Sequence, residues 1–459
     1  AHGVAGDGSG GVYLAGETWG SLGGPSAGLT DPWLARFDGA GNQVWVRQFG
    51  FGLDYFESAS FAAADGAGGV YVGGGRCDLL CASVQAWFAR YDAAGNELWN
   101  RSLPAAADVS AAAPDLSGGV YAGGGTEGSF GAPNAGKIDA WFARYDGAGN
   151  TLWMRQLSTG SANTSARAVC SDGSGGVYVG GSTNVSLGGQ PPVGGTDAFV
   201  ARYDDLGNEV WTRILGTAAG DRSGSVAPDG SGGVFVAGES TTNSGGNFHE
   251  DVWLARFDAA GNLAWTRQLA TSVDDEVGGA ASDGAGGVFV GGSTLGALGG
   301  PSAGSRDAWL VRYAPDPAPY CTAKANSCGT TPAIGATGTP SSTASSGFLV
   351  SATDTKAQKA GLLLYTDSGP GNAPFLGGTL CLNTSPRRLS TPVLEMSGSP
   401  GLCDCSLSTD MNSFRRGTLG GNPLPSLTVP GTRIHCQFWA RDTPGNSLLS
   451  DALQYFVGS

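Results

Sequence analysis

Lysine and histidine are scarce in this chain of 459 residues. The lysines are Lys137, Lys324, Lys356 and Lys359, and the histidines are His2, His249 and His435. No histidine belongs to a Ser-His-Asp arrangement or to an HExxH motif, the patterns that nucleophilic and zinc-dependent hydrolases use. His2 opens the chain, His249 is expected in a loop, and His435 on a strand. We therefore interpret the protein as non-catalytic.

Positive charge and long apolar runs are also lacking. The net charge is -14, which argues against nucleic acid and anionic membranes as partners. No apolar run approaches the length that a membrane helix needs, so no membrane insertion is expected. The first residues, AHGVAGDG, have neither a basic nor an apolar segment of a signal peptide. We expect an exported chain whose signal lies upstream.

A tryptophan-rich segment recurs along most of the sequence. Its first copy, DPWLARFDGAGNQVWVRQF, starts at Asp31, and further copies start at Gln85, Asp139, Asp197, Asp251 and Asp307. The aromatic pair keeps one spacing, and in the last copy Cys321 stands where the second tryptophan is expected. The pairs are Trp33 and Trp45, Trp87 and Trp99, Trp141 and Trp153, Phe199 and Trp211, and Trp253 and Trp265, followed by the single Trp309.

A second element, of the type DGSGGVYLAG, precedes each copy. It starts at Asp7, Asp65, Asp115, Asp172, Asp229 and Asp283, with separations of 58, 50, 57, 57 and 54 residues. A repeat of this length indicates a propeller or a solenoid. The segments are short, rich in β-branched and aromatic residues and bounded by Gly, Asp and Asn, which predicts strands and tight turns.

Each repeat predicts four strands, namely a small-residue strand, GGVY, DxWxAR and NxxWxRQ. Four-stranded sheets repeated radially are the blades of a propeller. Small residues suit the crowded axis, and the large indoles suit the outermost strand, where they cover the gap between blades. We predict an all-β fold with a six-bladed β-propeller over residues 1–313.

The pattern DGxGGVYVxG…DxWxARYDxxGNxxWxRQ resembles the bacterial SBBP, or beta-propeller, repeats of large secreted and surface proteins. The resemblance covers about two thirds of the chain and implies the fold, but it is nearly silent on function. The YDxxGNxxW piece is also similar to the repeats of quinoprotein propellers, which carry a cofactor site with charged and metal-binding groups. The sequence has no equivalent cluster, so no cofactor is expected.

A change of composition marks a second domain. Residues 314–319, APDPAP, predict a stiff linker, after which Trp439 is the only tryptophan. Residues 320–459 predict a β-sandwich with strands at Gly347–Ala352, Gly361–Tyr365, Leu424–Val429 and Ile434–Trp439. The pieces YCTAKANSCGTTPAIG and LPSLTVPGTRIHCQFWARD resemble a cysteine-containing module that ends many secreted bacterial proteins.

The cysteines predict disulfides and hence an oxidising, extracellular or cell-surface location. The candidates in the second domain are Cys321, Cys328, Cys381, Cys403, Cys405 and Cys436, and their connectivity stays open among fifteen possibilities. Cys77 and Cys81 are candidates for a bridge in the second repeat, and Cys170 is expected as a buried thiol. The alternative is a metal site at Cys403, Cys405, His435 and Cys436.

Arginines recur in the repeats at 36, 90, 144, 202, 256 and 312, and at 47, 101, 155, 213 and 267. We interpret them as structural, stacked on tryptophan and paired with repeat carboxylates such as Asp31 or Asp38. The alternative is a ring that binds a polyanion. The aspartates at 31, 139, 197, 251 and 307 are interpreted as hydrogen-bond acceptors at strand entry. The Asp-rich turns are interpreted as turn formers, with calcium as the alternative.

The last repeat is incomplete, because no NxxWxRQ strand follows Tyr313. The strand carrying Asp307, Trp309, Val311 and Tyr313 should then present an open edge, which favours strand addition. We expect this assembly edge to be covered by the second domain or by a neighbouring protomer.

The sequence thus favours a non-catalytic extracellular structural or adhesive protein that acts through protein contacts, by binding a partner or by self-association in a filament or matrix. The alternative is a glycan-binding or glycan-processing propeller that uses loops 17–30, 183–196 and 293–306, with Trp19 as their aromatic residue. The acidic pairs that a glycosidase needs, Asp274-Asp275-Glu276 and Glu250-Asp251, are expected in loops of neighbouring repeats.

Overall fold

The computed structural model describes residues 1–50, 52, 55–78, 84–104, 106–134, 137–157, 163–244, 247–284, 286–313, 318–357, 359–383, 387–388, 394–395, 402–429, 432–443 and 446–457. Contacts divide the chain into two compact units. The first comprises Ala1–Asn262 and Gln268–Tyr313, and the second comprises Leu263–Arg267 and Ala314–Ser459.

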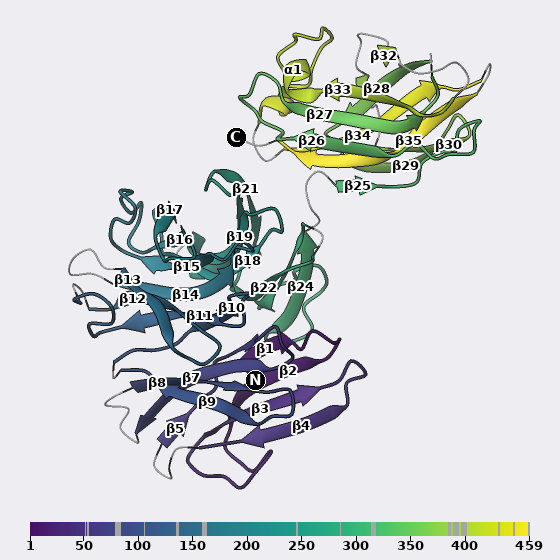
Figure 1. Cartoon of the computed structure of the whole chain (residues 1–459). Helices are drawn as coiled ribbons and strands as arrows, with labels where there is room; N and C mark the ends of the chain where they lie inside the picture. Colours follow the sequence, from purple (N-terminus) through teal and green to yellow (C-terminus); the bar gives the residue numbers. More distant parts are fainter. Residues whose placement is uncertain are drawn as a thin grey trace. The chain divides into compact units, whose positions relative to one another are not determined.

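The first three repeats each form one antiparallel sheet (Figure 1). The first sheet contains β1 (Gly3–Gly6), β2 (Val12–Thr18), β3 (Asp31–Phe37) and β4 (Gln43–Gln48). The second contains β5 (Tyr55–Glu57), β6 (Phe61–Ala64), β7 (Val70–Asp78), β8 (Val84–Tyr91) and β9 (Glu97–Ser102). The third contains β10 (Ala111–Pro114), β11 (Val120–Thr126), β12 (Asp139–Tyr145) and β13 (Thr151–Leu157).

The next three repeats continue this arrangement. The fourth sheet contains β14 (Thr164–Ser171), β15 (Val177–Thr183), β16 (Asp197–Tyr203) and β17 (Glu209–Leu215). The fifth contains β18 (Asp221–Pro228), β19 (Val234–Ser244), β20 (Asn247–Phe257) and β21 (Leu263–Leu269). The sixth contains β22 (Asp275–Ser282), β23 (Val288–Thr294) and β24 (Asp307–Tyr313).

The order of the strands in each sheet follows the order in the repeat, as predicted. The first turn is tight because the carboxylate of Asp7 accepts the N–H groups of Ser9 and Gly11 at 2.8 Å. The hairpin before the outer strand is closed by Asp38, which accepts from Ala40 and Asn42 at 2.9 Å. Asp and Asn are favoured at such positions because their side chains satisfy the backbone of the turn.

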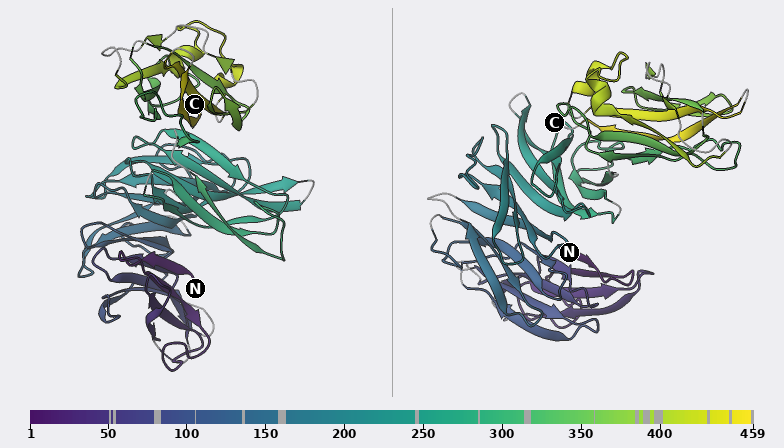
Figure 2. Two further views of the ribbon diagram at one scale, coloured as in Figure 1. Left: turned by 90° about the vertical axis from the view of Figure 1, so that its right-hand side faces the viewer. Right: turned by 45° about the horizontal axis from the view of Figure 1, so that its top comes forward.

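Each sheet has two faces that differ in their residues. The forward face carries the Tyr or Phe of GGVY and the Arg of DxWxAR, and the rear face carries the Val of GGVY and the Trp of DxWxAR. The forward face of one sheet packs on the rear face of the next, so that Tyr13, Leu34 and Trp45 contact Val70 and Trp87. The same packing joins the second to the fifth sheets. Figure 2 shows how the sheets follow one another along the chain. The predicted all-β propeller architecture is confirmed.

The second unit is a β-sandwich, as predicted. One sheet contains β25 (Ala318–Tyr320), β35 (Ser447–Phe456), β34 (Arg433–Arg441), β28 (Ala360–Thr366), β31 (Arg387–Arg388) and β32 (Leu394–Glu395). The other contains β26 (Ile334–Gly338), β27 (Phe348–Thr355) and β33 (Cys405–Asp410), and a hairpin is formed by β29 (Pro370–Phe375) and β30 (Gly378–Leu382). Side chains of both sheets, among them Phe348, Leu407, Leu363 and Phe438, share one core. The short α1 (Met411–Arg415) packs on it through Phe414.

Three local predictions were wrong. Residues 424–429 contain the 3-10 helix η1 (Pro425–Thr428) instead of a strand, because Pro425 removes a backbone donor and starts the helical turn. His249 lies on the extended strand β20 and is 7% exposed, not in a loop. In the predicted linker, residues 314–317 lie outside the described residues, and Ala318–Tyr320 pair with β35.

Candidate functional site

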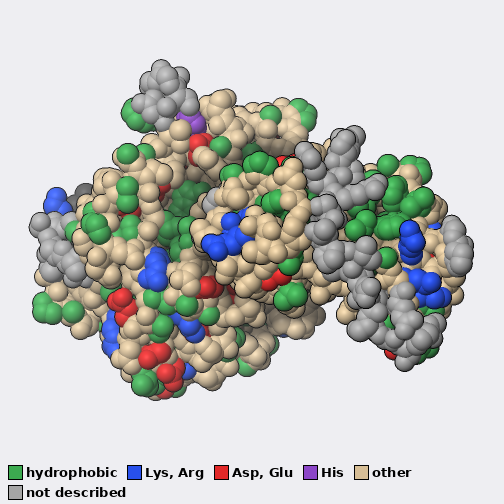
Figure 3. Space-filling model, turned by 90° about the horizontal axis from the view of Figure 1, so that it is seen from above, with side chains coloured by type: hydrophobic (Ala, Val, Ile, Leu, Met, Phe, Trp, Pro, Cys, Tyr) green, Lys and Arg blue, Asp and Glu red, His purple; other side chains and the backbone are tan. Residues whose placement is uncertain are grey.

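The inner strands of all six sheets line one cavity of about 580 Å³, here called the axial cavity. Its walls are mostly Gly, Ala and Val, which confirms the prediction that the small-residue strands lie innermost. Phe289 and Leu310 of the last sheet also line it, together with Val4 of the first. Figure 3 shows a hollow in the surface of the propeller unit in which hydrophobic side chains gather. The cavity therefore extends between the two ends of the row of sheets.

One position of the repeat supplies a residue to this cavity from every sheet. It lies five residues before the turn aspartate, and its occupants are all exposed: His2, Ser60, Ser110, Arg167, Gly224 and Gly278. Four consecutive sheets thus present polar side chains, and two present bare backbone. This set was not among the sequence-based predictions. Aligning the repeats on the turn aspartate would have revealed it, since only this comparison puts the six residues in register.

The arginine of DxWxAR pairs with the turn aspartate of the same sheet. The pairs, with N–O distances of 2.6 to 2.9 Å, are Arg36 with Asp7, Arg90 with Asp65, Arg144 with Asp115, Arg202 with Asp172, Arg256 with Asp229, and Arg312 with Asp283. The predicted partners Asp31 and Asp38 were wrong, because Arg36 lies opposite Tyr13 in the ladder and so reaches the turn that precedes β2. Asp31 instead accepts from Ala27 and Gln48, as a strand-entry acceptor.

These pairs shift the pKa of the buried carboxylates. Burial acts to raise the pKa of Asp172, but hydrogen bonds from Arg202, Ser174 and Gly176 outweigh it, so that the pKa lies below its usual range. The pKa values of Asp115 and Asp229 are lowered in the same way. These carboxylates are therefore ionised, and their hydrogen bonds stabilise the fold.

In the first four sheets, the outer tryptophan connects the sheet to the next one. The indole N–H of Trp45 donates to the carbonyl of Ala93 at 3.0 Å, and a guanidinium N–H of Arg36 donates to the same oxygen at 3.1 Å. The indoles of Trp99, Trp153 and Trp211 bind Gly147, Asp205 and Ala259 at 2.9 to 3.1 Å. The arginine two residues after each outer tryptophan stacks on it, as in Arg47 over Trp45 at 5.5 Å. The structural interpretation of the arginine array is confirmed.

The predicted assembly edge is open in the part of the chain that the structure describes. Among the described strands, β24 pairs with β23 alone. Trp309 is 8% exposed on the rear face, and Asp307 accepts from Ala303 at 2.9 Å. Val311 and Tyr313 pair with Val290 and Val288.

The forward face of the last sheet is exposed as well. Leu310 is 73% exposed, whereas Leu34, Phe88, Phe142, Val200 and Leu254 at the same repeat position are at most 1% exposed. Phe289 is 38% exposed, and its counterparts are at most 2% exposed. On the rear face of the first sheet, Val12 is 36% exposed, whereas the equivalent valines are buried. The forward face of the last sheet and the rear face of the first sheet are thus exposed, whereas the corresponding faces of the other sheets are buried.

The inner tryptophans lie in the packed interfaces. Trp87 and Trp141 are fully buried, whereas Trp33 and Trp253 are partly buried. Trp265 occupies the outer position in the fifth sheet, with Arg267 over its ring at 4.5 Å. The repeat tryptophans are accordingly packing residues.

Two disulfides occur in the second unit, Cys321–Cys381 and Cys328–Cys403. Cys405 and Cys436 are free and buried, so their assignment to a bridge was wrong; both fill the sandwich core as small apolar side chains. Cys77 is disulfide-bonded, and Cys81 lies outside the described residues. Cys170 is free and buried, as predicted.

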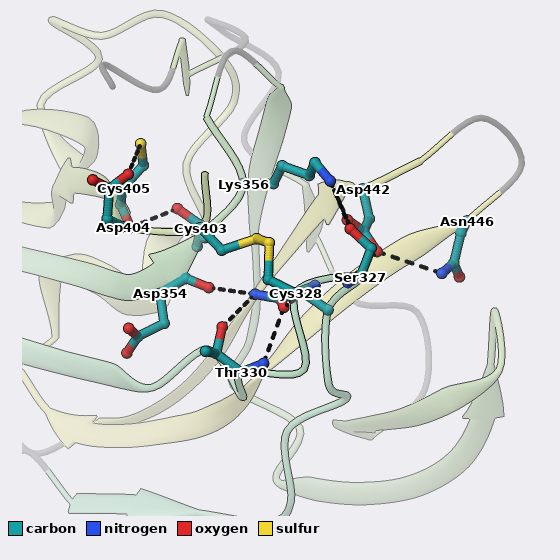
Figure 4. The surroundings of a disulfide bond; sticks show 12 residues. Ser327, Cys328, Thr330, Asp354, Lys356, Cys403, Asp404, Cys405, Asp442 and Asn446 are labelled. Carbon is teal, nitrogen blue, oxygen red and sulfur yellow. Dashed lines mark hydrogen bonds and ion pairs between the residues drawn. A yellow bond between two sulfur atoms is a disulfide. The ribbon is translucent and has the colours of Figure 1, made fainter. Parts of the chain in front are cut away.

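The Cys328–Cys403 bond also explains why the alternative metal site does not assemble. Figure 4 shows Cys403 turned toward Cys328, while Asp404 and Cys405 follow on the chain. Ser327 donates to Asp442 at 2.7 Å, and Lys356 lies 3.9 Å from the same carboxylate. His435 binds Tyr320 at 3.0 Å, and burial and Arg433 lower the pKa of His435 to about 4. Within the described residues, no three His, Cys, Asp or Glu side chains gather into a metal cluster.

A smaller hollow of about 290 Å³ lies beside the loop after β2. Trp19, 72% exposed, packs edge-on against Phe56 with ring centroids 5.9 Å apart. Glu17, Glu57 and Arg76 also line this hollow. The acidic pairs proposed for glycan processing serve other contacts: Glu250 lies 3.4 Å from Arg222, and Glu276 pairs with Arg306.

Residues 152–188 match the beta-propeller repeat family, SBBP. This SBBP segment runs from β13 through the inner half of the fourth sheet. The regulatory protein FlaEY of Caulobacter vibrioides is 31% identical over 166 residues, which are 32% of this chain and 17% of that protein. The chain thus spans about a sixth of the length of this relative.

Two solved structures are similar at low sequence identity. The β-propeller domain of the Trilobed protease from Pyrococcus furiosus, described as having an open velcro topology, gives a TM-score of 0.39 at 11% identity, with 76% of this chain and 88% of that chain covered. A puromycin hydrolase S511A mutant complexed with PGG gives 0.31 at 12% identity, covering 76% of this chain and 57% of that chain. No helix among the described residues is long and apolar enough to cross a bilayer.

Proposed function

We propose that the protein is a non-catalytic extracellular structural or adhesive protein that accepts a strand from another protein chain at its last sheet. The single observation that carries the proposal is the exposure of Leu310, at 73%, where the same position is buried in every other sheet. An exposed apolar face beside an open strand edge is the surface that strand addition uses. The two disulfides support a location outside the cytoplasm.

The other five sheets specify what the missing strand should contain. In the fourth sheet, Trp211 of the outer strand lies opposite Arg202, and Arg213 lies opposite Val200. A donated strand of this type would place its tryptophan opposite Arg312 and its arginine opposite Leu310. The tryptophan would then reach the hairpin of the first sheet, where Gly41 has open space around it.

A peptide can test this directly. The fluorescent peptide NEVWTRIL, residues 208–215, should bind the intact chain with saturable anisotropy, and its Trp-to-Ala form should bind at least tenfold more weakly. Leu310→Lys should weaken binding because the new charge repels the peptide arginine. Leu152→Lys is the matched control, since Leu152 is 53% exposed on a complete sheet.

Light scattering identifies the natural donor. Oligomers that the peptide disperses would make a second copy of this chain the donor, and a monomer that binds peptide would point to a different protein. If NEVWTRIL does not bind, or binds Leu310→Lys equally well, strand acceptance is wrong.

Glycan binding is a second candidate function, favoured by the exposed Trp19 beside Phe56, Glu17 and Arg76. An aromatic face with charged groups around it suits a sugar ring, which offers C–H groups and hydroxyls. A glycan array should then show hits that Trp19→Ala abolishes and Phe248→Ala keeps, since Phe248 is an equally exposed aromatic, at 72%, on β20. An array without hits would remove this candidate.

A further inference from the structure

Arg167 differs from every other arginine of residues 1–313. The other fourteen each donate to a carboxylate, an amide or a backbone carbonyl. Arg167 has no hydrogen bond, ion pair or ring contact with any residue that the structure describes, and it is exposed in the wall of the axial cavity. A guanidinium has five N–H donors, so Arg167 offers the cavity hydrogen-bond donors that no described residue accepts.

The backbone conformation of β14 directs the side chain of Arg167 toward the axial cavity. Arg167 is the extra residue of a bulge in β14, where the register shifts between Ala166 and Ala168. A bulge leaves one residue out of the ladder and re-aims its side chain. Gly224 and Gly278 occupy the same bulge in β18 and β22, without a side chain. The fourth sheet alone has a long side chain at this bulge.

The surroundings of Arg167 combine hydroxyls with apolar walls. Ser60 and Ser110 lie at the same repeat position in the second and third sheets, and none of the described residues that line the cavity carries a carboxylate. Two carboxylates that contact the polar residues of the cavity bind those residues themselves: Asp108 accepts from Ser110 at 2.9 Å, and Glu17 lies 3.6 Å from His2. Val4, Phe289 and Leu310 supply apolar surface. The cavity is thus suited to a ligand with one anionic group and an apolar body.

We propose that the axial cavity binds an organic carboxylate. The guanidinium of Arg167 holds the carboxylate by two parallel hydrogen bonds, and the apolar body of the ligand lies against the part of the wall that contains Gly224 and Gly278. One planar monoanion matches one guanidinium fork. A phosphate dianion requires more positive charge than a single arginine supplies in a protein of net charge -14. The carboxylate can belong to a free acid or to the C-terminus of a peptide, and both share this chemistry.

Calorimetry on the intact chain tests the proposal with octanoate, inorganic phosphate and the tripeptide Ala-Ala-Val with a free or an amidated C-terminus. Octanoate should bind more tightly than phosphate, and Arg167→Gln should weaken octanoate binding about tenfold or more. Arg306→Gln is the matched control, because Arg306 pairs with Glu276 at the surface. Binding of the free but not the amidated tripeptide identifies a peptide terminus as the source, and binding of octanoate alone identifies a free acid.

A second variant tests the cavity without touching the charge. A Cβ on Gly278 would meet its nearest neighbour, the carbonyl oxygen of Gly291, at 3.4 Å, so the backbone leaves room for a side chain there. Gly278→Leu should therefore fold and should fill the part of the cavity that the glycines leave empty. It should reduce octanoate binding at least tenfold while the strand-peptide affinity of the last sheet stays unchanged. Absence of octanoate binding, preference for phosphate, or equal octanoate binding by Arg167→Gln would each overturn the proposal.

Discussion

The fourth and the sixth sheets are built from nearly the same residues, yet they differ in what covers them. Tyr178 and Phe289 occupy one position, and they are 0% and 38% exposed. Arg202 and Arg312 make the same aspartate pair, but their side chains are 20% and 50% exposed. The fourth sheet is followed by a fifth, whose hairpin accepts the N–H groups of Trp211 and Arg202 at Ala259. In this fold the forward face of a sheet is therefore buried and hydrogen-bonded only when another sheet follows it.

The largest expected difference concerns the aspartate of the Arg-Asp pair. Asp172→Ala should lower the free energy of unfolding by about 4 kcal/mol, because it leaves the partly buried Arg202 without its partner. Asp283→Ala should cost about half as much, since the half-exposed Arg312 stays hydrated. Urea unfolding followed by tryptophan fluorescence measures both. Asp205→Ala, at an exposed carboxylate in a hairpin, is the control and should change little. Equal losses at Asp172 and Asp283 would mean that exposure of the pair does not matter.

A smaller difference is expected between two hairpin glycines. Gly207 has a φ of 75°, and a Cβ there would lie 2.8 Å from the ring of Trp153 of the preceding sheet. Gly41 has a φ of 82°, but nothing lies within 4 Å of its added Cβ, because the sixth sheet has no outer tryptophan. Gly207→Ala should cost about 3 kcal/mol, from backbone strain and the clash together.

Gly41→Ala should cost about 1 kcal/mol, from backbone strain alone. The same unfolding assay distinguishes the two variants. Adding the peptide NEVWTRIL should increase the loss of unfolding free energy that Gly41→Ala causes. Similar penalties without peptide would show that the first hairpin is already covered in solution.

The repeat pattern was sufficient to predict the strand order and the place of the tryptophans, because both depend on local periodicity that recurs in every copy. The partner of Arg36 was not predictable in this way. It depends on which residue lies opposite in the ladder, and the sequence offers Asp7, Asp31 and Asp38 as equally plausible carboxylates. Arg167 was missed for a different reason: its meaning comes from comparing one position across all repeats, where Gly224 and Gly278 show that a side chain is optional. In the second unit the repeat is absent, so neither Pro425 nor the free thiols of Cys405 and Cys436 had a second copy for comparison.

The smallest expected effect is on the acid response of the buried Arg-Asp pairs. The pKa of Asp172 lies below its ordinary value of 3.8, because hydrogen bonds from Arg202 and the turn outweigh burial. The native state therefore binds fewer protons than the unfolded state once the pH falls to about 4. The contribution of the pair is complete above that pH and is lost as the pH falls through the lower, folded-state pKa.

The free energy of unfolding of the wild type, taken from urea titrations, should accordingly decline from pH 5 to pH 3, by at most about 1.4 kcal/mol per pH unit for each such carboxylate. Asp172→Asn removes one titrating group with a lowered pKa and should flatten the decline. A midpoint that rises on acidification would reverse the sign assigned to the pair. It would mean that burial, rather than the guanidinium and the turn N–H groups, controls the carboxylate, and the fourth sheet would then be held by packing alone.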